Sequence, residues 1–197
     1  AINAAISSMP ETCRFVTWLG DDDTLISENL VFSLREIRDD LNIVATFGDI
    51  ELIDENGNVF TSFRTSQLAA WSIFFGPNRV PQPGSILRRS TFEHIGALNT
   101  QYKFSFDSDM FMRLAKRGTL KYVPHYVARF RWHQGSLSAG QSSDSIREAS
   151  TARLNNLPRT VSSIAWMWEW LHVRLALWQS RNSFDRKLQK AHSAGSD

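Results

Sequence analysis

The chain has 197 residues, a length that allows one domain with a sizeable core or at most two small domains. Its formal net charge is only +2 and charged residues make up 21% of the sequence, so no global field favours nucleic acid as the partner. The single cysteine, Cys13, excludes an intramolecular disulfide and a cysteine-rich zinc module. Any selectivity for a ligand or partner must therefore come from a local site.

The first forty residues predict a helix, a short strand and a second helix. Apolar residues at helical spacing predict the first helix within 1–9, and the apolar run 15–19 predicts a buried strand. Ser27 is placed to cap a helix that extends to about residue 40. We expect the apolar face of that helix to consist of Leu30, Val31, Leu34, Ile37 and Leu41. The sequence opens in mid-helix without a secretory leader, which predicts that further chain precedes it.

Three adjacent carboxylates, Asp21, Asp22 and Asp23, follow the predicted strand and Gly20. Ionised neighbours repel one another, and a bound divalent cation is the simplest setting in which all three stay charged. Oxygen ligands favour Mg²⁺ or Mn²⁺ over a softer metal. A solvated acidic turn before a helix N-terminus explains the triplet equally well, because negative charge is favourable there.

The middle of the chain predicts an antiparallel excursion and then a long loop. Strands are expected at 43–47, 50–53 and 59–63, with a hairpin turn at 54–58. Residues 67–75 predict a helix, and the prolines and glycines that follow predict an irregular loop of a kind that often carries function. A strand is expected at 85–88, and Ser90 with Glu93 matches the capping box of a short helix ending at Gly96.

Two acids open a further helix, predicted over 107–117. Residues two apart diverge by about 200° around a helix, so Asp107 and Asp109 cannot both face one site. Asp107 lies at the mouth of the helix, where it can reach a cleft or cap the backbone, and Asp109 can complement the helix dipole. Strands at 120–123 and 127–130 are expected next, before a Gly- and Ser-rich loop.

The order of five segments resembles the large inverting family of GT-A glycosyltransferases, glycosyl transferase family 2-like. These segments are Trp18–Asp23, Gly48–Ile50, Pro83–Arg89, Phe106–Leu114 and Arg131–Ser138. The resemblance implies an α/β fold with a mostly parallel central sheet, flanking helices and an antiparallel addition, and a nucleotide-binding first half that would precede this chain. We accordingly expect a metal-binding and acceptor-side part over 1–138. A flexible loop and a C-terminal helical extension are expected over 139–197.

The same resemblance implies an activity, namely transfer of a sugar with inversion from a nucleotide-diphospho-sugar to a hydroxyl of a carbohydrate or lipid-linked acceptor. Its DXD motif would hold Mn²⁺ or Mg²⁺ against the diphosphate, with Asp21, Asp22 and Asp23 at the donor and the latter two as metal ligands. Gly20 stands where the commoner family pattern has its first Asp. Asp107 inherits the role of general base, although Phe106 replaces an acid that many relatives carry before it.

Further site residues follow from the resemblance. His133 would ligate the ion or contact phosphate, and Arg131 would neutralise the diphosphate. Gln82 and Ser85 would border the acceptor pocket, with Asp109 also on the acceptor side. Read without the resemblance, a histidine after a strand is more usually a surface or packing residue, and the loop around Gln82 is an ordinary turn.

Four of the seven tryptophans lie in the segment 161–178. Glu169 and Arg174 interrupt it, so we expect no helix that spans a bilayer. Tryptophans with trailing cations suit an anionic membrane surface, and a helix packed on the catalytic domain or on a second subunit explains the pattern as well. A cytoplasmic enzyme of polysaccharide biosynthesis, peripheral at the inner face of the membrane, is the expected setting.

Two other classes of protein fit the same residues. One is a non-catalytic glycosyltransferase-like module that binds a partner or membrane through the Trp-rich helix. The other is a metal-dependent phosphohydrolase that uses the aspartate triplet. The products of the reaction would separate the second class from a glycosyltransferase.

Overall fold

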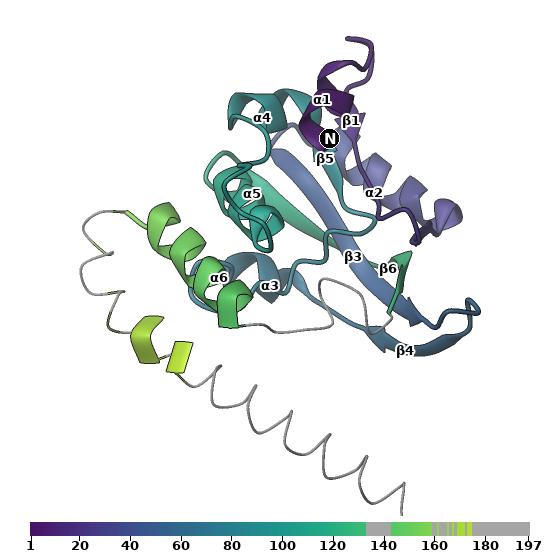
Figure 1. Cartoon of the computed structure of the whole chain (residues 1–197). Helices are drawn as coiled ribbons and strands as arrows, with labels where there is room; N and C mark the ends of the chain where they lie inside the picture. The colour runs from purple at the N-terminus through teal and green to yellow at the C-terminus, as the bar shows by residue number, and fades with distance from the viewer. Residues whose placement is uncertain are drawn as a thin grey trace, which may run out of the picture.

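The structure is a computed structural model that describes residues 1–132 and 143–158, together with positions 161, 165, 167, 169–171, 173 and 174. Two long strands, β3 (Ile43–Ile53) and β6 (Thr119–Arg131), pair in parallel at the centre of the sheet. Figure 1 shows this pair crossing the middle of the molecule, with helices on either side. The expected α/β architecture is confirmed.

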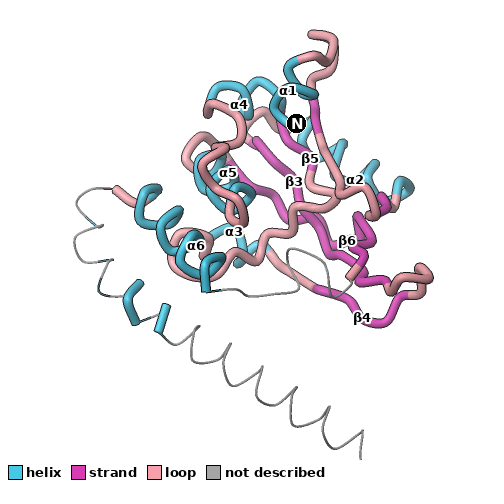
Figure 2. The backbone as a smooth tube through the Cα atoms, in the orientation of Figure 1, coloured by secondary structure: helices cyan, strands magenta, loops and turns pink. Residues whose placement is uncertain are grey.

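Shorter antiparallel strands extend the central pair on both sides. β5 (Ile86–Arg88) pairs with β3, and β1 (Phe15–Val16) pairs with β5. β2 (Thr24–Leu25) pairs with β6, which gives the order β1-β5-β3-β6-β2. The predicted antiparallel excursion is β4 (Val59–Phe63), which pairs with the carboxyl-terminal half of β3 (Figure 2).

Helices cover both faces of this sheet. On one face α2 (Ser27–Asp39) packs Ile37 against Ile43 of β3 and Ile86 of β5. On the other face lies α5 (Phe106–Ala115), with α4 (Arg89–His94) beside it. The other helices up to residue 156 are α1 (Ile2–Ser7), α3 (Gln67–Trp71) and α6 (Ser143–Asn156).

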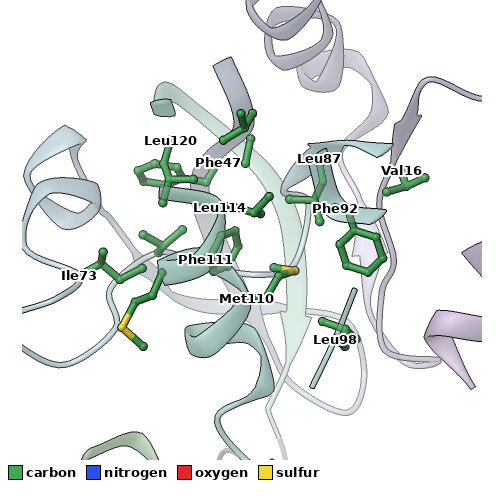
Figure 3. Packing of buried hydrophobic residues seen from close by; sticks show 14 of the residues in the cluster. Val16, Phe47, Ile73, Leu87, Phe92, Leu98, Met110, Phe111, Leu114 and Leu120 are labelled. Carbon is green, nitrogen blue, oxygen red and sulfur yellow. The ribbon is translucent and has the colours of Figure 1, made fainter. Parts of the chain in front are cut away.

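The main core lies between α5 and the sheet. Phe111 and Leu114 of α5 are fully buried and pack with Phe47 of β3, Leu87 of β5 and Phe92 of α4 (Figure 3). Removing a buried Phe side chain from such a core costs about 3–5 kcal/mol. The position of α5, and of the acids at its start, is therefore set by packing.

The predicted face of α2 is partly wrong. Ile37 is fully buried, but Leu41 is 80% exposed, and Val31 and Leu34 are also exposed. Small Ser33 is buried in their place, because it lets the helix approach the sheet along the row that ends at Ile37. The N-cap of α2 is Ile26, and it makes no side-chain cap bond, so the expected cap by Ser27 is also wrong.

Several predicted boundaries differ from the structure because tertiary pairing overrides the local pattern. The strands expected at 43–47 and 50–53 are one strand with register irregularities, and those at 120–123 and 127–130 are likewise one. The strand expected at 15–19 is only two residues long, and α3 is shorter than the helix predicted over 67–75.

The predicted capping box of α4 does not form. The N-cap of this helix is Arg88 and makes no side-chain cap bond. Glu93 instead accepts a 2.7 Å bond from the Nε of Arg89, one turn earlier on the same helix. The acid therefore serves a surface ion pair rather than the helix start.

Most of the Trp-rich segment lies outside the described residues. Among those described, Glu169 is buried and forms an ion pair with Arg153 of α6, with oxygen–nitrogen distances of 2.6 and 2.9 Å. Met167, Trp170 and Leu171 are exposed. Within the described part of the chain, no helix combines the length and the apolar character that crossing a membrane requires.

Candidate functional site

The acidic loop, Gly20 to Asp23, connects β1 to β2 and is attached to the end of β6. Asp23 Oδ1 accepts a hydrogen bond of 2.9 Å from the backbone nitrogen of Arg131. The Nε of Arg131 donates to the backbone carbonyl of Asp22 at 3.2 Å. The triplet thus lies at the carboxyl end of a central strand, where ligands of α/β sheets commonly bind.

Arg131 holds more than the acidic loop. Its Nη1 donates to the backbone carbonyls of Asp54 and Glu55 at 2.6 and 2.9 Å. These carbonyls belong to the turn between β3 and β4, so one guanidinium joins that turn to the acidic loop. The structure brings Arg131 next to the triplet, as the sequence predicts, and its contact with a diphosphate stays a prediction.

Two carboxylates border the same space beside Gly20. A side-chain Cβ built at Gly20 would lie 3.0 Å from Asp23 Oδ2 and 3.1 Å from Asp22 Oδ1. Asp21 is exposed at the turn. Paired carboxylate oxygens are the donors that Mg²⁺ and Mn²⁺ prefer, and the absence of a side chain at Gly20 lets one oxygen of each acid approach the same space, so Asp22 and Asp23 are residues that could hold such a cation.

The electrostatics of Asp23 agree with this fit. Burial raises the pKa of its carboxyl above the ordinary value, and the charge of Asp22 raises it further, against the lowering effect of the Arg131 amide. A bound cation would favour the ionised carboxylate and so oppose this rise in the pKa. Across the described residues no three His, Cys, Asp or Glu side chains cluster as metal ligands, and the third predicted ligand, His133, lies outside them.

The loop of predicted acceptor residues packs over β6. Gly84, with φ of +75°, approaches Val127 so closely that an added Cβ would lie 2.7 Å from its methyl group. Gln82 Nε2 donates to the carbonyl of Trp18 at 2.8 Å, which joins this loop to the segment entering the triplet. Ser85 is buried and its hydroxyl bonds to a carbonyl of its own loop. The acceptor contacts of Gln82 and Ser85 stay predictions.

Asp107 lies in the first turn of α5 and is half-buried. Its Oδ1 accepts from the backbone nitrogen of Ser108 at 2.7 Å and from the Ser108 hydroxyl at 3.4 Å. Burial raises the pKa of this carboxyl, and the bonds from Ser108 oppose the shift. A raised pKa brings a carboxylate closer to that of an effective general base.

Asp109 has different partners from Asp107, as the helical spacing predicts. It is buried and pairs with Arg113 one turn later, at 2.6 Å. Its other oxygen accepts from Asn156 of α6 at 2.9 Å. These contacts join α5 to α6. A direct contact between Asp109 and an acceptor substrate would have to compete with them.

The acidic loop and the start of α5 adjoin the same core. Trp18, just before the loop, and Phe106, just before Asp107, both pack against the main cluster on the α5 face. Only a short turn separates the end of α5 from the start of β6. The expectation of one cleft shared by Asp22 and Asp107 stays a prediction.

Two polar residues to which the sequence analysis assigned no role are prominent in the structure. Glu148 of α6 accepts bonds from three consecutive backbone amides before α5. Asp49 of β3 is buried and accepts from the Tyr122 hydroxyl at 3.0 Å and the Thr65 amide at 2.9 Å. No local pattern marks Glu148, whereas Asp49 belongs to the segment Gly48–Ile50 that contributes to the resemblance, without a role of its own there.

Comparison with solved structures finds one of similar α/β fold. The crystal structure of S. aureus TarS 1–349, a glycosyltransferase, matches with a TM-score of 0.50 and 14% sequence identity. The match covers 81% of this chain and 46% of the TarS chain, so the present chain spans less than half of that structure. At this identity the likeness shows the fold alone. No protein-family model matches the sequence, and no curated protein matches it either.

Proposed function

We propose that this chain is the metal-binding and acceptor-side part of an inverting glycosyltransferase. The enzyme transfers a sugar from a nucleotide-diphospho-sugar to a hydroxyl of a carbohydrate or lipid-linked acceptor. The observation that carries the proposal is the convergence of Asp22 and Asp23 beside Gly20, at the carboxyl end of β6. The similarity of the fold to that of TarS supports the same class.

The donor side is assigned to the acidic loop. Asp22 and Asp23, with His133 as third ligand, would hold Mn²⁺ or Mg²⁺, and Asp21 would add negative charge on the donor side. When bound, the cation neutralises charge on the departing diphosphate. Arg131 holds the loop through the backbone carbonyl of Asp22 and the carboxylate of Asp23, so that the Asp23 carboxylate keeps its direction.

The acceptor side is assigned to the start of α5. Inversion is a single displacement, which requires a base to remove the proton of the attacking hydroxyl on the side opposite the leaving group. Asp107 takes this role. Its half-buried position supports the assignment, because burial raises its pKa and strengthens it as a base.

The test uses the full-length protein and its thermal stability in the presence of UDP or GDP, with and without Mn²⁺. We expect stabilisation that requires the metal, and loss of it in Asp22→Asn and Asp23→Asn. In Asp107→Asn the stabilisation should persist while sugar transfer from UDP- and GDP-sugars falls about 100-fold or more. Sugar transfer at the wild-type rate by Asp107→Asn would show that Asp107 is not the general base. Release of phosphate from a phosphoester without sugar transfer supports a phosphohydrolase instead.

A second candidate function is docking through the Trp-rich helix. It is favoured by the exposed Met167, Trp170 and Leu171, and by Arg174, whose guanidinium lies 4.6 Å from the centre of the Trp170 ring. Further cations follow in the sequence: Arg181, Arg186, Lys187 and Lys190. Exposed apolar side chains that are followed in the sequence by cations suit an anionic membrane. Sedimentation with phosphatidylglycerol vesicles that is lost in Trp170→Ser supports it, and binding unchanged by that substitution contradicts it.

A further inference from the structure

The start of α5 has no cap from its own sequence. Its N-cap residue is Ser105, whose side chain makes no cap bond. In a capping box, a Glu three residues into the helix would accept from the N-cap amide. Here that position holds Ser108, which instead donates to Asp107. The backbone amides that lead into the helix therefore need an acceptor from elsewhere in the fold.

Glu148 of α6 supplies that acceptor. Its Oε1 accepts from the amides of Phe104 and Ser105 at 2.5 and 2.6 Å, and its Oε2 accepts from the amide of Lys103 at 3.0 Å. Burial raises the pKa of Glu148, but these three amides outweigh it and leave the pKa below its ordinary value. Glu148 is therefore ionised at neutral pH, and charge strengthens each bond.

A second contact fixes α6 to α5 at the other end. Asn156 Nδ2 donates to Asp109 at 2.9 Å, and Asn156 Oδ1 accepts from Lys116 Nζ at 2.8 Å. Asn156 lies eight residues after Glu148 on the same helix. Because α6 is held at these two points, the carboxylate of Glu148 is a fixed anchor rather than a mobile surface group.

We infer that Glu148 is a positioning residue for Asp107. It fixes the backbone of 103–105, and Asp107 lies two residues further along the chain. The direction of the Asp107 carboxylate follows from the direction in which this backbone enters the helix. Misplacing a catalytic group by about 1 Å can cost about 100-fold in rate. The inference rests on the proposed role of Asp107 as base.

The experiment measures kcat and KM for the full-length protein with the UDP- or GDP-sugar that supports transfer. Glu148→Ala should lower kcat at least tenfold and leave KM for the nucleotide-sugar within twofold. Glu148→Gln keeps an acceptor oxygen for the amides of Phe104 and Ser105, so it should recover at least threefold over the alanine variant. Arg147→Ala, an exposed position on the same helix, is the matched control and should stay within twofold of wild type.

Hydrogen exchange at the amides of 103–105 gives a readout independent of turnover. We expect faster exchange at these amides in Glu148→Ala, and less acceleration in Glu148→Gln, with Arg147→Ala unchanged. If the alanine variant does not fold, the glutamine variant alone decides, through its lower kcat and its faster exchange.

The outcomes separate the two proposals. Turnover lost in Asp107→Asn but kept within twofold in both Glu148 variants overturns the positioning role alone. Equal kcat in the alanine and glutamine variants also overturns it, because the acceptor oxygen then has no effect. Turnover that survives Asp107→Asn overturns the proposed base, and Glu148 then has no base to position.

Discussion

Gly20 is the residue whose lack of a side chain matters most for the proposed site. Asp22 and Asp23 both direct an oxygen at the space beside it. These oxygens are the ends of flexible side chains, so a methyl group there would turn the carboxylates away without disrupting the fold. A substitution at Gly20 should therefore affect cation binding more than it affects the stability of the fold.

We predict that Gly20→Ala lowers the apparent affinity for Mn²⁺ in the presence of UDP at least tenfold. The free energy of unfolding without ligand should change by about 1 kcal/mol or less. Titration of Mn²⁺ at fixed UDP, followed by thermal shift, measures the first effect. Gly76→Ala is the matched control, because an added Cβ there meets nothing within 4 Å. Equal Mn²⁺ affinity in both variants would contradict the assignment.

A stability prediction follows from the raised pKa of Asp107. Since burial disfavours its ionised form in the folded state, the folded protein loses stability as pH rises from the ordinary carboxyl pKa through the raised value. Asp107→Asn keeps an oxygen for the Ser108 amide and removes this loss. We expect the variant to be more stable than wild type near pH 7 and similar to it near pH 4, by urea denaturation. A less stable variant at neutral pH would contradict this.

Tyr122, which is half-buried, makes a polar contact with buried Asp49 whose contribution to stability can be measured. Its hydroxyl donates to Asp49 at 3.0 Å, and burial together with this bond raises its pKa to about 12. Tyr122→Phe leaves Asp49 with one fewer donor and should cost about 1–2 kcal/mol by urea denaturation. Tyr126→Phe, which removes a hydroxyl bonded to exposed Arg64, is the control and should cost less. Equal losses would contradict the argument.

At the scale of elements, helices and strands were predicted well where apolar periodicity is strong. The spacing that predicted α2 and α5 is local, and the helices form close to the expected bounds. The predicted buried face of α2 was partly wrong, because the burial of Ser33 depends on how near the sheet lies. No pattern within the helix indicates that distance. The caps at Ser27 and Ser90 failed for the same reason, since neighbouring elements set the helix starts.

The ion pair of Arg153 with Glu169 joins α6 to a described residue of the Trp-rich segment, and both side chains are buried. Glu169→Ala leaves a buried guanidinium whose remaining described bond goes to the Gly76 carbonyl, so we expect a loss of about 3 kcal/mol by urea denaturation. Glu93→Ala, which breaks a pair on the surface, is the control and should cost under about 1 kcal/mol. Similar losses in the two variants would argue against a buried anchor.

At the scale of the whole molecule, the fold class was predictable and the contacts across the site were not. The order of motifs led to the α/β fold that the TarS likeness supports, and it placed the triplet and Arg131 in one neighbourhood. The bond that joins Asp23 to Arg131 spans 108 residues. The bond from Ser105 to Glu148 spans 43 residues. Such contacts follow from the folded topology, so a single sequence carries no local sign of them.

The parallel pairing of β3 with β6 also affects how this protein acquires its structure. Ile43 is registered with Thr119, so the centre of the sheet closes only after more than seventy intervening residues are in place. Pairing at this sequence separation slows folding, because the entropy of closing the chain is lost before the contacts that stabilise the pair have formed. During synthesis the apolar strand β3 leaves the ribosome long before its partner, and it needs shielding from other nascent chains until β6 emerges. Recombinant yield should therefore rise when chaperones are co-expressed or when translation is slowed by cooling.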